Sequence, residues 1–573
     1  MISRETRRLL RTYDDGSLLR APATPTATPT PAVAPTPIPA AAPDPVSTAP
    51  THAPASTLTA GHSRTAPAHA PQPSVRAHLG GLVACRRAWA ERLLALLTWP
   101  VLRGGPHIDV EEEPLAELRE LAARGPLVFL PAHRSYADSL VLAAVLRDAG
   151  ICAPWRLAGA NLSFWPLGPI IRRTGTIFIR RAFGLDPSYH LAVRCVLADL
   201  LARAQNLEWY PEAGRSRTGR LRGIRTGMLR LLVAAYLDSG IEDVHVVPVS
   251  IVYDALPDTE AVVEQDAGAV KRPEGLRALF RYLKAGRTLG PRYAWPSFGQ
   301  PISLREISRS ATNEWDTVRV LTRRVANGLR DATQVTAESL LALILAQNDD
   351  TFRGDDDLRE QISALLRYTA RSRIPVCGAS RMEAALDGML RTRVLTRYPE
   401  GYAVRGGRQR VLAYHRNIVE HWFLPRAAAE LVATGDITAR RVSELLAPLH
   451  SPSSRHKADA ALDAFAHRVE DESAALAGGW ARQPFLLAPP LLTPVFQAYH
   501  AAATSSPAET RSAELRVAAD DFLTHQKLLG DDRDGTVRRD AFTREISLLL
   551  ARLRLMAALD ADRHAGIIAD VRH

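Results

Sequence analysis

Between residues 108 and 305 the apolar positions change their period along the chain, and this alternation predicts the fold. Short apolar runs typical of buried strands occur in PLVFLPAH, RTGTIFIRR, NLEWYPEAG and VHVVPVSIVYD. Between them, SYADSLVLAAVLRDAG, SYHLAVRCVLADLLARAQ and RTGMLRLLVAAYLDSG place their apolar residues at helical spacing. Alternating strands and helices predict an α/β layer with a largely parallel sheet flanked by helices.

Beyond about residue 335 the pattern becomes mostly helical, as in TAESLLALILAQN, LRVAADDFLTHQKLLG and TREISLLLARLRLMAALDAD. One stretch differs, because SRMEAALDGMLRTRVLTRYPEGYAVRGG predicts a helix and then a hairpin that turns at Pro399, Glu400 and Gly401. Such a unit is either winged-helix-like or an ordinary helix–hairpin packing element. We therefore predict an α/β domain over residues 108–334 and a mostly helical C-terminal domain over residues 335–573.

The N-terminal residues carry two further patterns. Residues 21–73 consist mainly of Ala, Pro, Thr and Ser, which leave little to bury, so we predict a disordered tail over residues 1–78. Residues 79–107 have the pattern of a basic amphipathic helical segment. Such a helix either lies in a lipid interface or packs on the protein's own core. Its apolar face would be formed by Leu82, Cys85, Trp89, Leu93 and Leu96.

Composition narrows the class of partner without choosing one. The 573 residues carry a net charge of +11, which favours nucleic acid, an anionic lipid surface, phosphorylated ligands or an acidic carrier protein. The four cysteines show no CxxC and no paired spacing, which argues against a disulfide framework or a structural zinc site. No stretch reaches the roughly 18 apolar residues of a spanning helix, so we expect any membrane contact at the surface.

Residues 127–150, LVFLPAHRSYADSLVLAAVLRDAG, contain the first candidate for chemistry. On one helix, His133 and Asp138 would lie about 140° apart and would not face each other. Ser135 is a good N-cap, however, and Asp138 then falls at the third helical position, with its carboxylate pointing back to the turn that holds His133. The pattern fits either a general base oriented by a carboxylate or only a well-capped helix. A Ser-His-Asp hydrolase is disfavoured because the G-x-S-x-G elbow is missing.

The second candidate is RRTGTIFIRRAFG, residues 172–184, in which arginines stand at both ends of a short apolar strand. The planar guanidinium group matches the oxygens of a phosphate, so this pattern favours an anionic substrate. The alternative is a strand whose charged ends face water. The arginines are Arg172, Arg173, Arg180 and Arg181.

The third candidate is WYPEAGRSRTGRLRG, residues 209–223. Gly214 permits a close approach of the backbone, and donors that can surround a phosphate follow it: Arg215, Ser216 and Arg217. The cluster lacks the Gly-Lys-Ser/Thr of a Walker loop. Glu212 does not suit a pure anion site and would bind substrate hydroxyls or hold an arginine in position. The alternative interpretation is a basic turn.

A fourth stretch, VVPVSIVYD over residues 246–254, reads as a strand with Pro248 inside it. Proline has no N–H to give to a sheet ladder, so Pro248 predicts an edge strand or a bulge. The position either shapes a pocket or ends the strand.

The order and spacing of these four stretches are more specific than any one of them. The set H-x4-D, G-x-I-F-I-R-R, E-x-G-R-S-R and a later V-P-V strand resembles the four sequence blocks of the glycerol-3-phosphate acyltransferases, above all the bacterial membrane-associated ones. VLAYHRNIVEHWFLP, residues 411–425, is similar to part of that family's C-terminal region. The resemblance covers roughly residues 80–560 and leaves the Pro/Ala/Thr-rich tail unmatched. Ala213 stands where the family usually has glycine.

The resemblance implies that residues 108–334 form an acyltransferase domain. This domain would transfer an acyl group from acyl-CoA or acyl-carrier protein to the sn-1 hydroxyl of glycerol 3-phosphate, giving lysophosphatidate in the first step of phospholipid synthesis. His133 would be the general base and Asp138 its orienting partner. Glu212 and Gly214 would shape the acceptor pocket, and Pro248 belongs to the fourth block. Glycerol 3-phosphate would be held by Arg180, Arg181, Arg215, Ser216 and Arg217.

The resemblance implies neither a metal nor a redox cofactor. It implies an anionic membrane surface as a partner, and a peripheral or monotopic protein on the cytoplasmic face of the cell membrane. Two alternatives stay open: an acyltransferase for dihydroxyacetone phosphate or lysophosphatidate, and a basic nucleic-acid-binding protein that uses the unit near residues 379–407. We expect no nucleic acid, because the arginine clusters lie with the block that holds His133 rather than on the recognition helix of that unit.

Overall fold

A computed structural model describes most of the chain beyond residue 74. The described residues are 75–103, 106–135, 137–160, 163, 167–180, 186–254, 259, 263, 292–346, 352–435, 437–450, 458–476, 483, 485–504, 546–554 and 556. Most of the predicted tail, the predicted helix at 515–530 and Arg181 therefore lie outside the described residues. Residues 75–78 of the predicted tail instead belong to a helix, α2 (Val75–Leu82).

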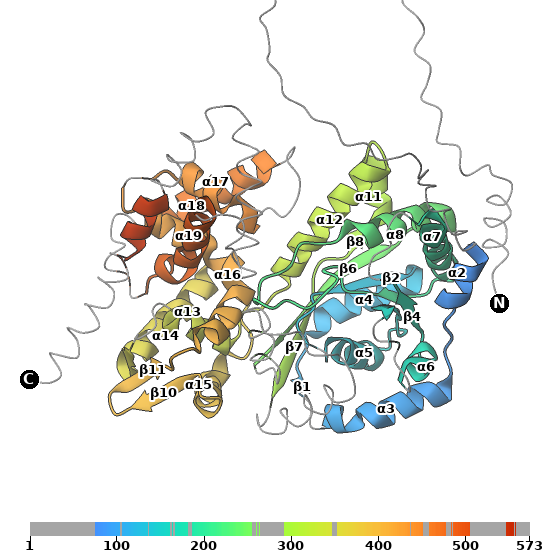
Figure 1. Ribbon diagram of the computed structural model, residues 1–573, viewed down its shortest axis with the longest axis horizontal. Helices are drawn as coiled ribbons and strands as arrows, with labels where there is room; N and C mark the ends of the chain where they lie inside the picture. The colour runs from blue at the N-terminus through green and yellow to red at the C-terminus, as the bar shows by residue number, and fades with distance from the viewer. Residues whose placement is uncertain are drawn as a thin grey trace, which may run out of the picture.

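An eight-stranded sheet forms the centre of the N-terminal part (Figure 1). Its strands are β1 (His107–Ile108), β2 (Leu127–Pro131), β3 (Trp155–Gly159), β4 (Thr176–Ile179), β5 (Leu207–Glu208), β6 (His245–Tyr253), β7 (Tyr293–Phe298) and β8 (Ile302–Ser303). The order is β1-β7-β6-β2-β5-β3-β4, with β8 paired to β6. The pairs between β6 and β4 are all parallel, which confirms the predicted largely parallel sheet. β7 and β8 run antiparallel to β6, an addition that the sequence pattern did not predict.

Successive residues of β2 supply two hydrophobic cores, one on each face of the sheet, because side chains alternate along a strand. Val128 and Leu130 pack with α2, α7 (Pro187–Ala202), α8 (Thr226–Ser239), α11 (Leu304–Ser310) and α12 (Glu314–Asp331). Leu127 and Phe129 pack with α4 (Glu112–Arg124) and α5 (Asp138–Asp148). Helices therefore cover both faces, so the ends of the strands are where polar groups can gather.

Pro248 lies in the interior of the sheet, so the edge strand, one of the two predicted alternatives, is wrong. It pairs with Leu130 of β2 on one side, and its C=O accepts from the N–H of Gly299 on the other side. On that second side β8 pairs with β6 up to Val246 and β7 begins at Val249, so the ladder is already interrupted where the proline lacks its N–H. A methyl group on Gly328 of α12 would come within 2.6 Å of the Pro248 ring, which shows how tightly α12 packs there.

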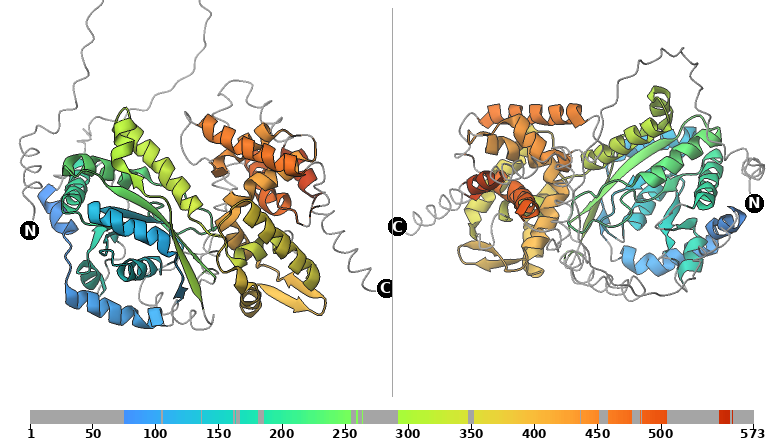
Figure 2. Two further views of the ribbon diagram at one scale, coloured as in Figure 1. Left: turned by 180° about the vertical axis from the view of Figure 1, so that it is seen from behind. Right: turned by 45° about the horizontal axis from the view of Figure 1, so that its top comes forward.

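The predicted amphipathic helix over residues 79–103 is divided in two. α2 ends at Leu82, and α3 spans Ala88–Arg103. Between them Arg86 forms a β-bridge with Thr174, and its guanidinium donates to the C=O groups of Ala153 and Pro154 at 2.7 Å each. The break separates the predicted apolar face, because Leu82 is buried whereas Leu96 is exposed. α3 runs along the outer edge of the N-terminal part (Figure 2).

The C-terminal part is mostly helical, as predicted, and lies beside β7 and α12 (Figures 1 and 2). Its first elements are α13 (Ala337–Leu345), β9 (Phe352–Gly354), α14 (Asp355–Arg371), α15 (Met382–Arg391), β10 (Leu395–Tyr398) and β11 (Gly401–Val404). The predicted helix and hairpin are confirmed, and β9 adds a third strand in the order β10-β11-β9. The helix–strand–helix–helix–strand–strand sequence is that of a winged helix. The remaining helices are α16 (Gln409–Val432), α17 (Ala439–His450), α18 (Ala458–Leu476) and α19 (Ala488–Thr504).

Candidate active site

The predicted blocks meet at one edge of the sheet, beyond the carboxyl ends of its parallel strands. His133 follows β2, Arg180 follows β4, Glu212 lies shortly after β5, and Tyr253 ends β6. Ligand sites of α/β proteins usually lie at this edge, because the loops that leave parallel strands converge there.

His133 and Asp138 contact each other directly. The imidazole Nδ1 lies 3.2 Å from Asp138 Oδ2. The histidine side chain is 20% exposed, whereas the aspartate side chain is completely buried. A carboxylate at Nδ1 fixes the proton on that nitrogen and leaves Nε2 as the acceptor. This contact is the one that a general base with an orienting carboxylate requires.

The capping arrangement differs from the predicted one. The helix begins with Asp138, its N-cap is Ala137, and Ser135 instead accepts from the N–H of Ala137 through its hydroxyl. The Asp138 carboxylate still reaches back, since its Oδ2 accepts from the N–H groups of Arg134 and Ser135 at 2.8 Å each. The regular helix thus begins later than predicted, but the bond from the N–H of Ser135 to the carboxylate three residues on is that of the predicted capping box. The predicted contact between the carboxylate and the imidazole is nevertheless present.

Two tyrosines that the sequence analysis did not single out complete the surroundings of this pair. Tyr253 at the end of β6 donates from its hydroxyl to Asp138 Oδ1 at 2.8 Å. The ring of Tyr210 stacks on the imidazole of His133, with centroids 3.9 Å apart and planes inclined by 24°. Burial raises the pKa of Tyr210 well above its usual value, so the phenol stays neutral. An aromatic residue directly after a buried strand was the only sequence signal for either tyrosine.

Tyr210 is itself held in place by hydrogen bonds that begin at its hydroxyl. Its hydroxyl lies 2.7 Å from the Ser139 hydroxyl, which also hydrogen-bonds to Glu208. Glu208 in turn accepts from Arg156 of β3 at 3.0 Å. The stacked ring therefore connects His133 to a polar network that includes residues of α5, β5 and β3, and this network restricts the plane of the imidazole.

Glu212 ties the third block to the backbone of the first. One carboxylate oxygen accepts from the N–H of His133 at 2.8 Å, and the other accepts from the N–H of Arg222 at 2.7 Å. Burial raises the pKa of Glu212, while these two donors act in the opposite direction. The N–H of Ser216 donates to the C=O of His133 at 2.9 Å, a second tie between the same two loops. Glu212 thus holds backbone groups, whereas the sequence suggested that it would bind substrate hydroxyls or hold an arginine in position.

The residues after Glu212, which we call the arginine loop (residues 214–222), contain the predicted phosphate donors, but the N–H and the hydroxyl of Ser216 both donate within the protein. Arg217 is exposed and Arg215 is half-buried, while Ser216 is buried and donates through its hydroxyl to the C=O of Arg220 at 2.7 Å. Ala213 has a φ of +53°, a left-handed conformation that glycine adopts at lower cost. This explains why a glycine is usual at that position in the family it resembles.

Arg180 lies further away, because β5 and β3 separate β4 from β2. Three strand spacings amount to about 14 Å. Its guanidinium pairs with Asp186 at 3.3 Å and lies over the ring of Tyr189. Arg172 of the same cluster donates to the C=O groups of Gly81 and Val83, so it fastens the N-terminal segment. Pro248 is buried in the middle of β6 and packs against α12, so it does not lie at the strand ends.

Arg134 is a further residue that sequence reasoning missed. Its side chain is buried and donates to the Ser250 hydroxyl at 2.8 Å, to the C=O of Ile251 at 3.1 Å and to the Thr333 hydroxyl at 3.2 Å. Arg134 therefore connects the loop that carries His133 with β6 and with Thr333, which follows α12. No pattern in the sequence distinguishes it from an exposed loop arginine.

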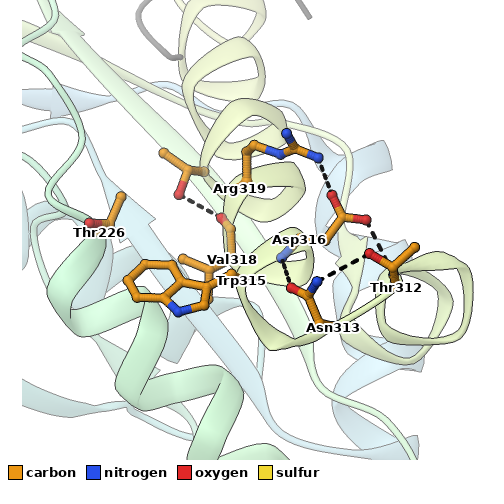
Figure 3. A pocket seen from close by; sticks show the side chains of 8 residues that line it. Thr226, Thr312, Asn313, Trp315, Asp316, Val318 and Arg319 are labelled. Carbon is orange, nitrogen blue, oxygen red and sulfur yellow. Dashed lines mark hydrogen bonds and ion pairs between the residues drawn. The ribbon is translucent and has the colours of Figure 1, made fainter. Parts of the chain in front are cut away.

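A hollow of about 430 Å³ lies elsewhere, between α8 and α12 (Figure 3). It is lined by Thr226, Thr312, Asn313, Trp315, Asp316, Val318, Arg319 and Thr322. None of these is a predicted site residue, so the hollow carries no part of the proposed chemistry. In the described part of the chain, no group of three or more His, Cys, Asp or Glu side chains is placed to hold a metal ion.

Two families match the sequence. The acyltransferase family matches residues 108–252, and the glycerol-3-phosphate acyltransferase C-terminal region matches residues 263–562. The plsB1 protein of Mycobacterium tuberculosis, described as an acyltransferase, is 33% identical over 56% of this chain and 54% of its own length. The glycerol-3-phosphate acyltransferase of Glaesserella parasuis is 31% identical over 60% of this chain and 45% of its own length. The chain thus spans about half the length of these relatives.

The chain is also similar to a solved structure. The 1-acyl-sn-glycerophosphate (LPA) acyltransferase PlsC from Thermotoga maritima is 14% identical, with a TM-score of 0.24. The match covers 45% of this chain and 78% of that chain.

Proposed function

Because the chain belongs to the glycerol-3-phosphate acyltransferase family, we propose that it transfers a fatty acyl group to the sn-1 hydroxyl of glycerol 3-phosphate. The donor would be acyl-CoA or acyl-carrier protein, and the product lysophosphatidate, so that the reaction is the first step of phospholipid synthesis. The family relationship alone names neither the acyl donor nor the hydroxyl that is acylated, so both belong to the proposal.

The contact between His133 and Asp138 carries the proposal. With Nδ1 bound to the carboxylate, Nε2 accepts the proton of the sn-1 hydroxyl while that oxygen attacks the thioester carbon. The tetrahedral intermediate then collapses, the carbon–sulfur bond breaks, and the imidazolium returns the proton to the leaving thiolate. Asp138 orients the ring throughout and stabilises the imidazolium that forms. In this proposal the reaction needs neither a metal nor a redox cofactor.

The acceptor's phosphate would bind at the arginine loop, whose Ser216 is hydrogen-bonded to the C=O of His133. This bond fixes the distance between the phosphate donors and the general base, so a small acceptor can reach both. Arg215 and Arg217 supply the charge, and Gly214 lets the Arg222 guanidinium approach the backbone, where a methyl group would lie 2.5 Å from it. Arg180 and Arg181 would contribute from the end of β4, which is three strands from β2 in the sheet, and this role rests on the resemblance.

The assay that tests the function offers the purified chain two donors and three acceptors. We expect release of thiol from acyl-CoA or acyl-carrier protein only with glycerol 3-phosphate, and a product acylated at sn-1. Faster transfer to dihydroxyacetone phosphate or lysophosphatidate would replace the proposed acceptor. Thiol release that does not depend on any acceptor would indicate a hydrolase instead.

Substitution of Arg217 by alanine should raise the KM for glycerol 3-phosphate about tenfold and leave kcat within about threefold. The reason is that a charge-assisted hydrogen bond to phosphate contributes about 1.5–3 kcal/mol, of which an exposed arginine delivers the lower part. Steady-state kinetics with varied acceptor measure this. Arg124→Ala, an exposed arginine of α4, is the matched control. A KM equal to that of the control would remove Arg217 from the phosphate site.

Membrane contact is the second part of the proposal. None of the described helices is long and apolar enough to cross a bilayer. α3, however, exposes Trp89 (54%) and Leu96 (69%), and Arg87 and Arg92 near them are exposed as well. Apolar side chains beside arginines favour an anionic lipid interface. We therefore place α3 on the membrane, with the protein peripheral or monotopic on its cytoplasmic face.

The double variant Trp89→Ala/Leu96→Ala should reduce binding to vesicles that contain phosphatidylglycerol by about 10- to 100-fold. Each large apolar side chain contributes about 1.5–3 kcal/mol when fully buried, and an interfacial helix buries part of it. Co-sedimentation measures the bound fraction. Trp315→Ala removes an equally exposed tryptophan from α12 and should bind like the wild type. Equal binding by the double variant would show that α3 is not the contact.

Nucleic-acid binding by the winged-helix unit is not part of the proposal. The exposed positions on the helix before the hairpin, α15, include Glu383 and Asp387, whose carboxylates would repel a phosphate backbone. Arg397 of the hairpin is already paired with Asp355. DNA binding with a steep salt dependence would contradict this expectation.

A further inference from the structure

The arginine loop does not rest on its own domain alone, because helix α16 of the C-terminal part lies against it. α16 contains the VLAYHRNIVEHWFLP segment, for which the sequence suggested no role. The residues of α16 that face the loop and the end of α12 recur at helical spacing along one side of the helix. They are Tyr414, Asn417, Ile418 and His421, with Glu420 at their edge.

Backbone contact between the loop and α16 is unusually close at one residue. Gly219 has a φ of +88°, and a methyl group on it would lie 2.0 Å from the backbone oxygen of Tyr414. Because that neighbour is backbone rather than a movable side chain, only glycine fits there. Next to it, the side-chain amide of Asn417 donates to the C=O of Thr218 at 2.9 Å. The loop backbone is thus shaped to this helix.

An ion pair completes the contact. Arg220 of the loop donates to Glu420 through two nitrogens, with Nε–Oε1 at 2.6 Å and Nη2–Oε2 at 3.0 Å. Both side chains are largely covered, so the pair is screened less than a surface pair would be. The C=O of Arg220 accepts from the Ser216 hydroxyl, and Ser216 in turn is bonded to His133. A continuous path therefore leads from Glu420 to the catalytic loop.

α16 is also hydrogen-bonded to the end of α12 and to Thr333, which follows it. Trp422 donates through its indole to the C=O of Thr333 at 2.8 Å, and the Thr333 hydroxyl accepts from Arg134. His421 lies 2.9 Å from the C=O of Arg330 through Nε2. Burial lowers the pKa of His421 to about 3, so the imidazole is neutral there. The helix therefore contacts the arginine loop directly and reaches the loop of His133 through Thr333 and Arg134.

We propose that α16 positions the arginine loop for the acceptor's phosphate, with Glu420 and Asn417 as positioning residues. Arg220 is committed to Glu420, so the phosphate is bound by the arginines before it in the loop. The C-terminal part is then required for affinity towards the acceptor, although it contributes no group that touches the reacting atoms. This inference rests on the proposed function, since it assigns the loop to glycerol 3-phosphate.

The test is Glu420→Gln in the full chain, which removes the charge of the carboxylate and keeps its shape. We expect the KM for glycerol 3-phosphate to rise about 5- to 20-fold, within the usual range of coupling between two sites. The KM for the acyl donor and kcat should stay within about twofold. Trypsin should also cut the loop after Arg215 or Arg217 faster in the variant, a readout that requires no activity. The double variant Arg220→Glu/Glu420→Arg should return both quantities towards the wild-type values.

Asp238→Asn is the matched control, because it breaks the Arg194–Asp238 ion pair between α7 and α8 without touching the loop. It should change neither the acceptor KM nor the loop cleavage. Two results would overturn the inference: an unchanged loop cleavage in Glu420→Gln, or an equal loss in kcat and in both KM values that the charge swap fails to reverse. A wild-type chain that does not acylate glycerol 3-phosphate would defeat the proposed function instead, and the cleavage rates would still decide the role of α16.

Discussion

Replacement of His133 by alanine should lower kcat for acyl transfer by about 10²- to 10⁴-fold, the usual contribution of a positioned general base. The hydroxyl of the acceptor is a weak nucleophile while it keeps its proton, and in the variant only water could accept that proton. The KM for the acceptor should change little, because the phosphate donors lie on a different loop. Steady-state kinetics with both substrates varied give the two constants separately.

His467→Ala is the control for this substitution, since that imidazole is 83% exposed on α18. The fold of the His133 variant should persist, because Asp138 keeps the backbone N–H groups of Arg134 and Ser135 and the hydroxyl of Tyr253 as donors. Circular dichroism and thermal unfolding would verify this. If the variant kept more than about a third of the wild-type kcat, the histidine would be only a residue of the turn before a helix, and the catalytic assignment would be withdrawn.

Asp138→Asn should lower kcat about as much as His133→Ala does, by about 10²- to 10⁴-fold. The single oxygen of asparagine can take the place of Oδ2 and accept from the same three donors. The amide can face Tyr253, whose hydroxyl is able to turn round and accept. The variant thus preserves the hydrogen bonds and removes the negative charge that stabilises the imidazolium. We therefore expect a nearly unchanged unfolding temperature together with a large loss in kcat.

The matched control is Asp148→Asn at the other end of α5, where the carboxylate is 71% exposed. It should behave like the wild type in both measurements. A fall in unfolding temperature with full activity in Asp138→Asn would mean that the carboxylate only stabilises the start of the helix. Loss of activity with preserved stability would mean that its charge serves the chemistry.

The local pattern of apolar residues and turn residues was sufficient to predict the elements that bury one regular face, and a hairpin of the C-terminal part. The apolar run of β2, the helices α5, α7 and α8 and the hairpin after α15 all follow from the spacing of apolar residues and from turn residues. β7 and β8 could not be predicted in this way, because an antiparallel strand added to β6 depends on which surface is free in the folded sheet. Pro248 shows the same limit, since its missing N–H matters only where the neighbouring ladder is interrupted.

The division of the predicted amphipathic helix has a similar cause. Helical spacing of Leu82 and Leu96 is a local property, and it would suit one continuous helix. Arg86, however, finds the C=O groups of Ala153 and Pro154 and a bridge to Thr174, all remote in sequence. These contacts hold the chain extended between α2 and α3, and no local pattern reveals them.

For the candidate site, the sequence by itself determined which residue types follow which strands, and hence that a histidine, an aspartate and an arginine loop meet at one sheet edge. Parallel strands impose this, because all their carboxyl ends lie on the same side. Only the tertiary structure decided how the groups are held: Tyr210 against the imidazole, Tyr253 on Asp138, and Glu420 on Arg220. The two members of each pair are 77 to 200 positions apart in the sequence. Such pairing depends on the packing of whole elements rather than on local spacing.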